Sequence, residues 1–135
     1  MPNSLFTKII NGEIPCQKIH ETDNVLAFLD IRPINAGHTL IVPKVEVDHL
    51  WELDDDIYAE VMLVTKQVAS RIREVLQPVR VGMLLEGFQV PHAHVHAYPL
   101  YDAMESTFLD YFDRNKRDDF PSSDELDAMA KKLAF

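Results

Sequence analysis

The stretch Val90–Tyr98, VPHAHVHAY, carries a histidine at every second position. Successive side chains of a β-strand point to opposite faces, so His92, His94 and His96 would share one face of a strand. Small or apolar residues occupy the alternate positions and would form an opposite face slim enough to lie under a helix. On a helix the rings at 92 and 96 would align while the ring at 94 pointed away. The pattern therefore predicts a strand with imidazoles about 6.6 to 7 Å apart along one face.

Such a row of histidines fits three kinds of site. The rings could be structural, each satisfied by neighbouring hydrogen bonds. They could be metal ligands, because two histidines two apart on a strand can share a zinc ion with a further His or carboxylate. They could also serve nucleophilic catalysis, in which one imidazole attacks while its neighbours orient it and bind charge. Strict alternation of three histidines disfavours the purely structural role and leaves both chemical roles open.

Length and charge restrict the kind of protein. A chain of 135 residues is expected to form one domain with a single sizeable core. Its 13 basic and 22 acidic residues give a net charge of −9, which argues against nucleic acid or an anionic membrane as the main partner. Cys16 is the single cysteine, so no intrachain disulfide can form. Without a signal-peptide pattern or a long apolar stretch, the sequence predicts a cytoplasmic protein.

The motif His92–Tyr98 resembles the signature of the histidine triad (HIT) superfamily, in which three histidines alternate with apolar residues. Three upstream segments resemble its nucleotide-binding branch in order and spacing: FTKIINGEIP at Phe6–Pro15, AFLDIRP at Ala27–Pro33 and GHTLIVPK at Gly37–Lys44. The resemblance implies an α+β fold with a five-stranded antiparallel sheet and packed helices, and a homodimer in which two sheets join. It implies a HIT core over residues 1–100, with residues 101–135 as a C-terminal extension of the same domain.

Periodicity predicts the elements around the motif. A long helix is expected to open at Asp54–Asp56 and to end before Pro78, with apolar residues spaced by three and four. A short helix is expected around Phe6, and a terminal helix after the capping box Ser122–Glu125. Strands are expected over residues 14–20, 25–30, 38–42, 79–85 and 88–98. The last of these is expected to start or bend at Pro91, which has no N–H to donate to a ladder.

The resemblance also implies roles for individual residues. It makes His94 the nucleophile that attacks the α-phosphorus, with the carbonyl of His92 holding the hydrogen of the attacking ring. It implies that His96 and His38 donate to phosphate oxygens, although His38 could instead cap its own turn. Asp30 either caps a turn or accepts hydrogen bonds from ribose hydroxyls. The remaining nucleotide contacts are implied for Phe6, Ile9, Phe28, Leu29, Ile31, Gly87, Gln89 and Val90.

Some positions depart from the family pattern. Many relatives carry a Cys-x-x-Cys pair of a structural zinc site where this chain has Ser4 and Thr7, and Glu46 stands where a histidine is frequent. A closed zinc site needs thiolates, so we predict no structural metal and expect no required cofactor. Phe88 replaces a common glutamine, and this replacement keeps open a role other than catalysis.

The predicted function is hydrolysis at the α-phosphate of a purine nucleotide that contains AMP or GMP. The candidate substrates are nucleoside phosphoramidates, aminoacyl adenylates and dinucleoside polyphosphates, cleaved through a nucleotidyl-histidine intermediate. Two other classes stay open: a catalytically weak nucleotide-binding or scaffold protein, and a metal-dependent hydrolase that uses the histidine row as ligands.

Overall fold

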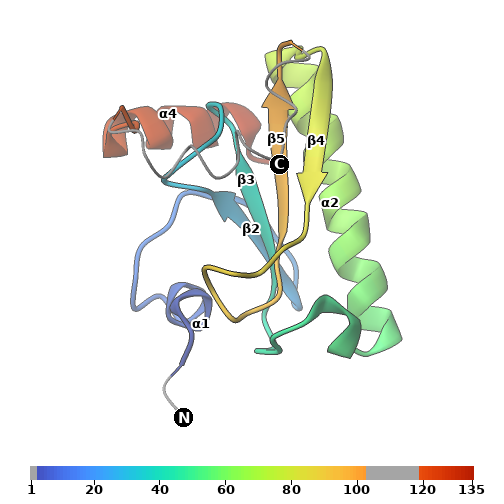
Figure 1. Ribbon diagram of the computed structural model, residues 1–135. Helices are drawn as coiled ribbons and strands as arrows, with labels where there is room; N and C mark the ends of the chain where they lie inside the picture. The colour runs from blue at the N-terminus through green and yellow to red at the C-terminus, as the bar shows by residue number, and fades with distance from the viewer. Residues whose placement is uncertain (1–2, 103–118) are drawn as a thin grey trace.

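The computed structural model describes residues 3–102 and 119–135, so the part of the predicted extension over residues 103–118 lies outside the described residues. The elements in chain order are α1 (Leu5–Ile10), β1 (Lys18–Glu21), β2 (Val25–Leu29), β3 (Thr39–Pro43), a 3-10 turn (Leu50–Glu52), α2 (Asp55–Leu76), β4 (Arg80–Leu84), β5 (Val95–Leu100) and α4 (Ser123–Leu133). The strands form one antiparallel sheet in the order β1-β2-β3-β5-β4, with β1 and β4 at its edges (Figure 1). The predicted α+β fold is confirmed. Within the described ranges, no helix has the length and apolar character needed to cross a membrane.

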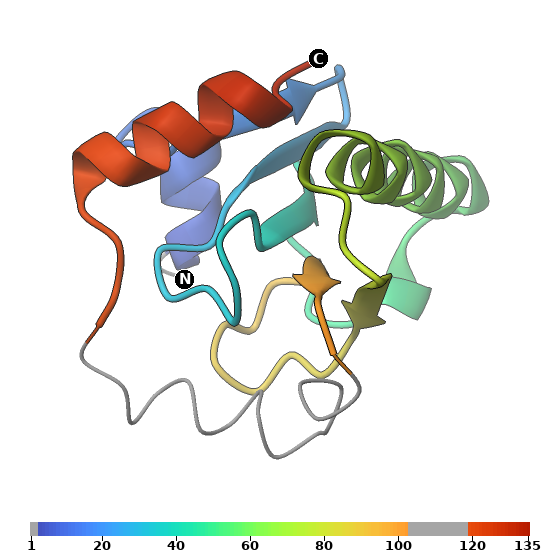
Figure 2. The same cartoon turned by 90° about the horizontal axis from the view of Figure 1, so that it is seen from above.

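The sheet buries a different core on each face. Ala27, Ile41 and Val95 are partners in register, and they pack on the face covered by α2 and α4. Their chain neighbours point the other way, so Phe28 and Leu40 lie on the face covered by α1. Figure 2 shows α1 and α2 on opposite sides of β2. The prediction that the alternate residues of the histidine motif lie under a helix is confirmed.

Helix α2 follows the predicted spacing of three and four. Val61, Val64, Val68 and Ile72 are buried on its inner side, where they contact the sheet. Acidic residues occupy the first turn, at the positive end of the helix dipole. The helix ends at Gln77, which adopts a left-handed conformation with φ of 52°. The predicted long helix is therefore confirmed over 22 residues.

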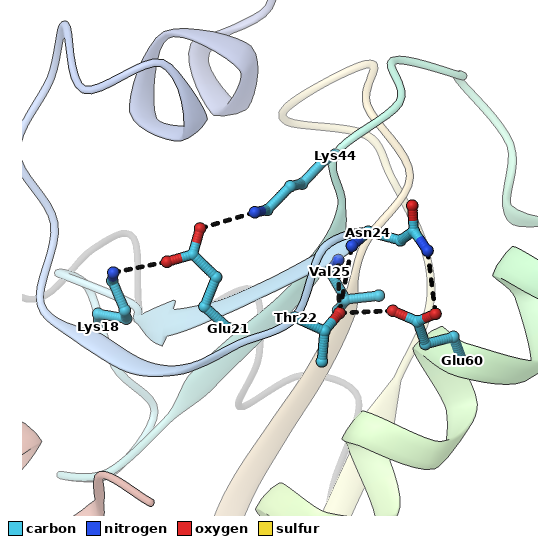
Figure 3. A network of polar contacts seen from close by, with 7 residues as sticks. All are labelled: Lys18, Glu21, Thr22, Asn24, Val25, Lys44 and Glu60. Carbon is cyan, nitrogen blue, oxygen red and sulfur yellow. Dashed lines mark hydrogen bonds and ion pairs between the residues drawn. The ribbon is translucent and has the colours of Figure 1, made fainter.

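The turn between β1 and β2 is tied to α2 by polar contacts (Figure 3). Glu60 on α2 accepts hydrogen bonds from the hydroxyl of Thr22 and from the side-chain amide of Asn24. The adjacent Glu21 lies between the ammonium groups of two lysines, at 2.6 and 2.7 Å. Hydrogen bonds from these lysines lower the pKa of Glu21 to about 2. The contacts of Glu60 fix the turn of the β1–β2 hairpin against the long helix.

The histidine strand is shorter than the sequence predicted. β5 begins at Val95, so of the three triad histidines His96 alone lies on a strand. Pro91 has no N–H, and the next two N–H groups donate outside the ladder, to the carbonyls of Val90 and Val47. The backbone therefore joins the sheet four positions later than the proline, and the expected strand over 88–98 is wrong in its first half. β1 likewise begins at residue 18 instead of 14.

Candidate active site

A cavity of about 300 Å³ opens on the face of the sheet that α1 covers. This volume is at the lower end of the range for small-molecule sites, roughly 300–1,000 Å³. Ten of the predicted site residues line it: Phe6, Ile9, Phe28, Leu29, Asp30, Ile31, Gln89, Val90, His94 and His96. Further lining residues that the sequence analysis did not single out are Leu5, Ile14, Pro15, Cys16, Gln17, Arg32 and Leu40. Most of these are apolar or uncharged, and nothing in their local pattern separates them from ordinary core or strand residues.

The ring of His94 is held as a neutral base at the cavity wall. Its Nδ1 lies 2.7 Å from the carbonyl oxygen of His92. A carbonyl only accepts, so Nδ1 carries the hydrogen and Nε2 of the neutral ring keeps its lone pair. Burial lowers the pKa of His94, and the hydrogen bond to His92 opposes this only in part. A neutral ring held in this way could act through Nε2 as a base or as a nucleophile.

His38 and His96 form a hydrogen-bonded pair, and His96 lines the same cavity. The N–H of Ile34 donates to Nδ1 of His38 at 3.0 Å, which places the hydrogen of neutral His38 on Nε2. That nitrogen lies 2.9 Å from Nδ1 of His96 and donates to it. His96 therefore carries its own hydrogen on Nε2. His38 both holds its turn and orients His96, so the two alternatives for this residue coexist.

Asp30 follows β2 at the cavity wall. Its Oδ1 accepts a hydrogen bond from the N–H of Arg32 at 2.8 Å, so the predicted turn-capping role is observed. Its Oδ2 lies 3.6 Å from Nε2 of His38. The carboxylate also borders the cavity, which is the position that ribose binding would require.

His92 lies beneath the site and does not line the cavity. The side chain is buried, its Nε2 donates to the carbonyl of Pro43 at 2.8 Å, and its Nδ1 accepts from the hydroxyl of Ser4 at 2.7 Å. Burial lowers the pKa of His92, which favours this neutral form. The ring edge contacts of Phe6 with His92 and His94, at centroid distances of 5.7 and 5.0 Å, pack both histidines against α1. His92 thus acts through its carbonyl, which holds the neighbouring ring.

A family model for the HIT domain matches residues 11–103 of this sequence. The chain belongs to the HIT family. It is 32% identical over 140 residues to Protein hit of Bacillus subtilis, covering 98% of this chain and 95% of that protein. It is 39% identical over 99 residues to an adenosine 5'-monophosphoramidase of Schizosaccharomyces pombe, covering 70% of this chain and 72% of that protein. A solved HIT-like protein of Bartonella henselae matches with a TM-score of 0.80 at 26% identity, covering 97% of this chain and 94% of that one. The resemblance inferred from the sequence motifs is confirmed.

In this HIT domain, a hydrogen-bonded cluster stands where the resemblance would place a structural zinc site. The hydroxyl of Thr7 and the N–H of Ser4 donate to Glu46 at 2.6 and 2.7 Å, and Ser4 also contacts His92. These hydrogen bonds lower the pKa of Glu46 to about 2. Structural zinc is held by thiolates and imidazoles, whereas this cluster offers two hydroxyls, a carboxylate and one ring nitrogen. These residues do not fit a closed zinc site. They connect the start of α1 to Glu46 and to His92 instead.

Two acidic-histidine groups in the described part of the chain lie close enough to share an ion. They are Asp30 with His38 and His96, and Glu86 with His94 and His96, each with ligand atoms within 4.8 Å of one another. Both groups include His96, a histidine of the row. The alternative in which the histidine row binds a metal ion therefore remains to be tested.

The loop before the histidines holds the residue that sequence reasoning missed. Gly87 does not line the large cavity but a smaller hollow of about 110 Å³, which it shares with Glu86 and His94. Glu86 lies between the strands expected over residues 79–85 and 88–98, and its sequence context predicted no role for it. Its side chain is 5% exposed, and Oε1 lies 3.8 Å from Nε2 of His96. An acidic residue directly after the apolar Leu84-Leu85 pair was the available signal.

Proposed function

We propose that this HIT protein hydrolyses purine nucleotides at the α-phosphate, with His94 as the nucleophile. The observation that carries the proposal is the hydrogen bond from His94 Nδ1 to the His92 carbonyl, which leaves Nε2 as a lone-pair donor beside a cavity of small-molecule size. The similarity to the adenosine 5'-monophosphoramidase of Schizosaccharomyces pombe favours nucleoside phosphoramidates as the first substrates to test. Aminoacyl adenylates and dinucleoside polyphosphates share the same reacting centre and form the second group.

The cavity residues suggest how the nucleotide would be held. The apolar side chains of Phe6, Ile9 and Phe28 would contact the purine ring, which is flat and largely apolar on its faces. The carboxylate of Asp30 would accept from the ribose hydroxyls, because charge-assisted hydrogen bonds are short and strong. Seated this way, the nucleotide would bring its α-phosphate to the histidines at the other end of the cavity.

Cleavage would then proceed in two steps. Nε2 of His94 bonds to the α-phosphorus as the bond to the leaving group breaks, giving a nucleotidyl-histidine. The leaving group takes up a proton from solvent, so a phosphoramidate releases ammonia or an amine. Water next bonds to the phosphorus, and the P–N bond breaks to release the nucleoside monophosphate. The Nε2–H of His96 would donate to a non-bridging oxygen, where negative charge grows in each transition state. The hydrogen bond from His38 keeps that donor in place.

The first test removes the nucleophile. We expect His94→Ala to lower kcat on adenosine 5'-phosphoramidate by more than about 10³-fold, because covalent catalysis has no substitute group there. Nucleotide affinity, measured by calorimetry with AMP, should stay measurable because the base and ribose contacts remain. His20→Ala, on β1 and stacked on Phe135, is the matched control and should keep full turnover. Turnover by His94→Ala at the unmodified rate would refute the nucleophile assignment.

The other two classes predict different results in the same assays. A nucleotide-binding or scaffold protein would bind AMP tightly but would form no covalent adduct on His94 with any of the three substrate groups. A metal-dependent hydrolase would lose activity after chelation and regain it with added metal. We propose that no metal is required, so dialysis against a chelator should leave kcat unchanged.

The sheet edges favour a homodimer. The edge at β1 is covered by the C-terminal end of the chain, since the N–H of Phe135 donates to the carbonyl of Ile19. In the described residues no strand pairs with the outer edge of β4, and apolar side chains stand exposed there, including Met83 at 51%. Such an edge is a template for pairing with another strand. We propose that two copies join their sheets at β4.

A further inference from the structure

Glu86 is a buried carboxylate with two fixed oxygens beside the histidines. Its Oε1 lies 3.8 Å from His96 Nε2, and its side chain is 5% exposed. Its Oε2 accepts a hydrogen bond from the N–H of Phe88 at 2.9 Å, which holds the carboxylate inside the turn. The carboxylate is therefore held next to His96 and largely screened from bulk solvent.

His94 stands between two separate spaces. One is the cavity of about 300 Å³ that would take the nucleoside, and the other is the hollow of about 110 Å³ that Glu86 and Gly87 also line. The hollow has room for several water molecules. Glu86 does not line the nucleoside cavity, so a nucleotide bound there leaves the hollow open to water. Water can therefore stand next to the nucleophile and the carboxylate while the nucleotide is in place.

We propose that Glu86 is the general base for the second half of the reaction, in which water hydrolyses the nucleotidyl-His94 intermediate. The proposal rests on the function proposed above. The water oxygen bonds to phosphorus while one water proton passes to the carboxylate of Glu86. The P–Nε2 bond breaks, and its electron pair returns to Nε2, so that His94 is again neutral. The proton on Glu86 then passes to bulk water through the hollow.

The distances and the neighbouring groups support Glu86, instead of Gln89 or His96, as the acceptor of the water proton. The ligand atoms of Glu86, His94 and His96 all lie within 4.8 Å of one another, so one water can contact the carboxylate and the phosphorus carried by His94. Gln89 lines the nucleoside cavity, but a side-chain amide is not a base. His96 already donates through Nε2 in the proposed mechanism and cannot accept the water proton at the same atom.

The experiment compares the Glu86→Gln variant with the unmodified protein. The amide oxygen of glutamine can still accept from Phe88, so the turn is kept while the base is lost. With adenosine 5'-phosphoramidate, we expect steady-state kcat to fall by roughly 10²–10⁴-fold, the usual contribution of general base catalysis. The first turnover should persist as a burst, and intact-protein mass spectrometry after acid quench should detect a nucleotidyl adduct on His94. Glu74→Gln, an exposed glutamate near the end of α2, is the matched control and should behave as the unmodified protein.

A second variant distinguishes loss of the base from loss of structure. Glu86→Ala leaves space for a small carboxylate, so added formate should restore part of its steady-state rate. Normal kcat in Glu86→Gln, or a reduced kcat without any adduct, would overturn the role of Glu86. Absence of both turnover and adduct in the unmodified protein would instead refute the proposed function itself, and the role of Glu86 with it.

Discussion

At the level of single residues, the acid–base state of His94 is set by its surroundings. Burial lowers its pKa, and the same cause lowers that of His92. A lowered pKa means that the neutral, nucleophilic ring persists to more acidic pH than the ordinary value of about 6.5 allows. Burial therefore keeps both imidazoles neutral to lower pH than in an exposed histidine.

This shift predicts the pH dependence of catalysis. Because kcat/KM reports ionisation of the free enzyme, its acid limb should fall below pH 6.5, with activity lost only as pH drops through the lowered pKa of His94. The measurement is a pH profile of adenosine 5'-phosphoramidate hydrolysis, corrected at each pH for the uncatalysed rate. An acid limb centred above pH 6.5 would contradict the proposed environment of the nucleophile.

At the level of elements, the hydroxyl that caps the short helix α1 also makes the shortest contact between this end of the chain and the ring of His92. Ser4 accepts from the N–H of Thr7 at 3.0 Å as the N-cap of α1, and it also contacts Nδ1 of His92 at 2.7 Å. The ring of His92 is held at its other nitrogen by Pro43, so the two contacts fix the segment that carries the carbonyl bonded to His94. Helix capping and alignment of the nucleophile are therefore coupled.

Removing that hydroxyl should affect both properties. We expect Ser4→Ala to lower the free energy of unfolding by about 0.5–2 kcal/mol through loss of the cap. We also expect kcat to fall by up to about 10²-fold, since small displacements of a nucleophile are costly. Ser4→Thr keeps the hydroxyl and should be close to normal in both respects. Thermal unfolding and steady-state kinetics check the two effects. Reduced stability with unchanged kcat would show that the hydroxyl serves only the helix.

At the level of the whole molecule, the proposed assembly depends on the outer edge of β4, with which no strand pairs in the described residues. Light scattering during size-exclusion chromatography should give a dimer mass for the unmodified protein. Met83→Glu should give a monomer, because the added carboxylates would face each other across the joined strands. Leu63→Glu replaces an equally exposed leucine on α2 and should remain dimeric. A dimer that survives Met83→Glu would place the contact elsewhere.

Local sequence predicted the parts of the fold that depend on periodicity. The alternation around His96 predicted which residues face α2, and the valine spacing predicted the long helix, because side-chain direction follows directly from strand and helix geometry. The extent of the histidine strand was predicted wrongly. Pro91 was the local sign that the ladder is interrupted, but where β5 starts also depends on the partners that neighbouring segments offer, and the segment by itself does not carry that information.

The tertiary structure alone decided how the site is assembled. The contact between Ser4 and His92 joins residues 88 positions apart, and that between His38 and His96 joins residues 58 positions apart. The placement of Glu86 is a further example, because a turn with Gly87 at φ 74° brings its carboxylate beside the nucleophile. The sequence by itself determined the motif, the family and the layers of the fold. Packing decided which histidine nitrogens carry a hydrogen and where the carboxylate of Glu86 lies. The reason is that hydrogen-bond partners distant in the chain come together only when the sheet and its loops have folded.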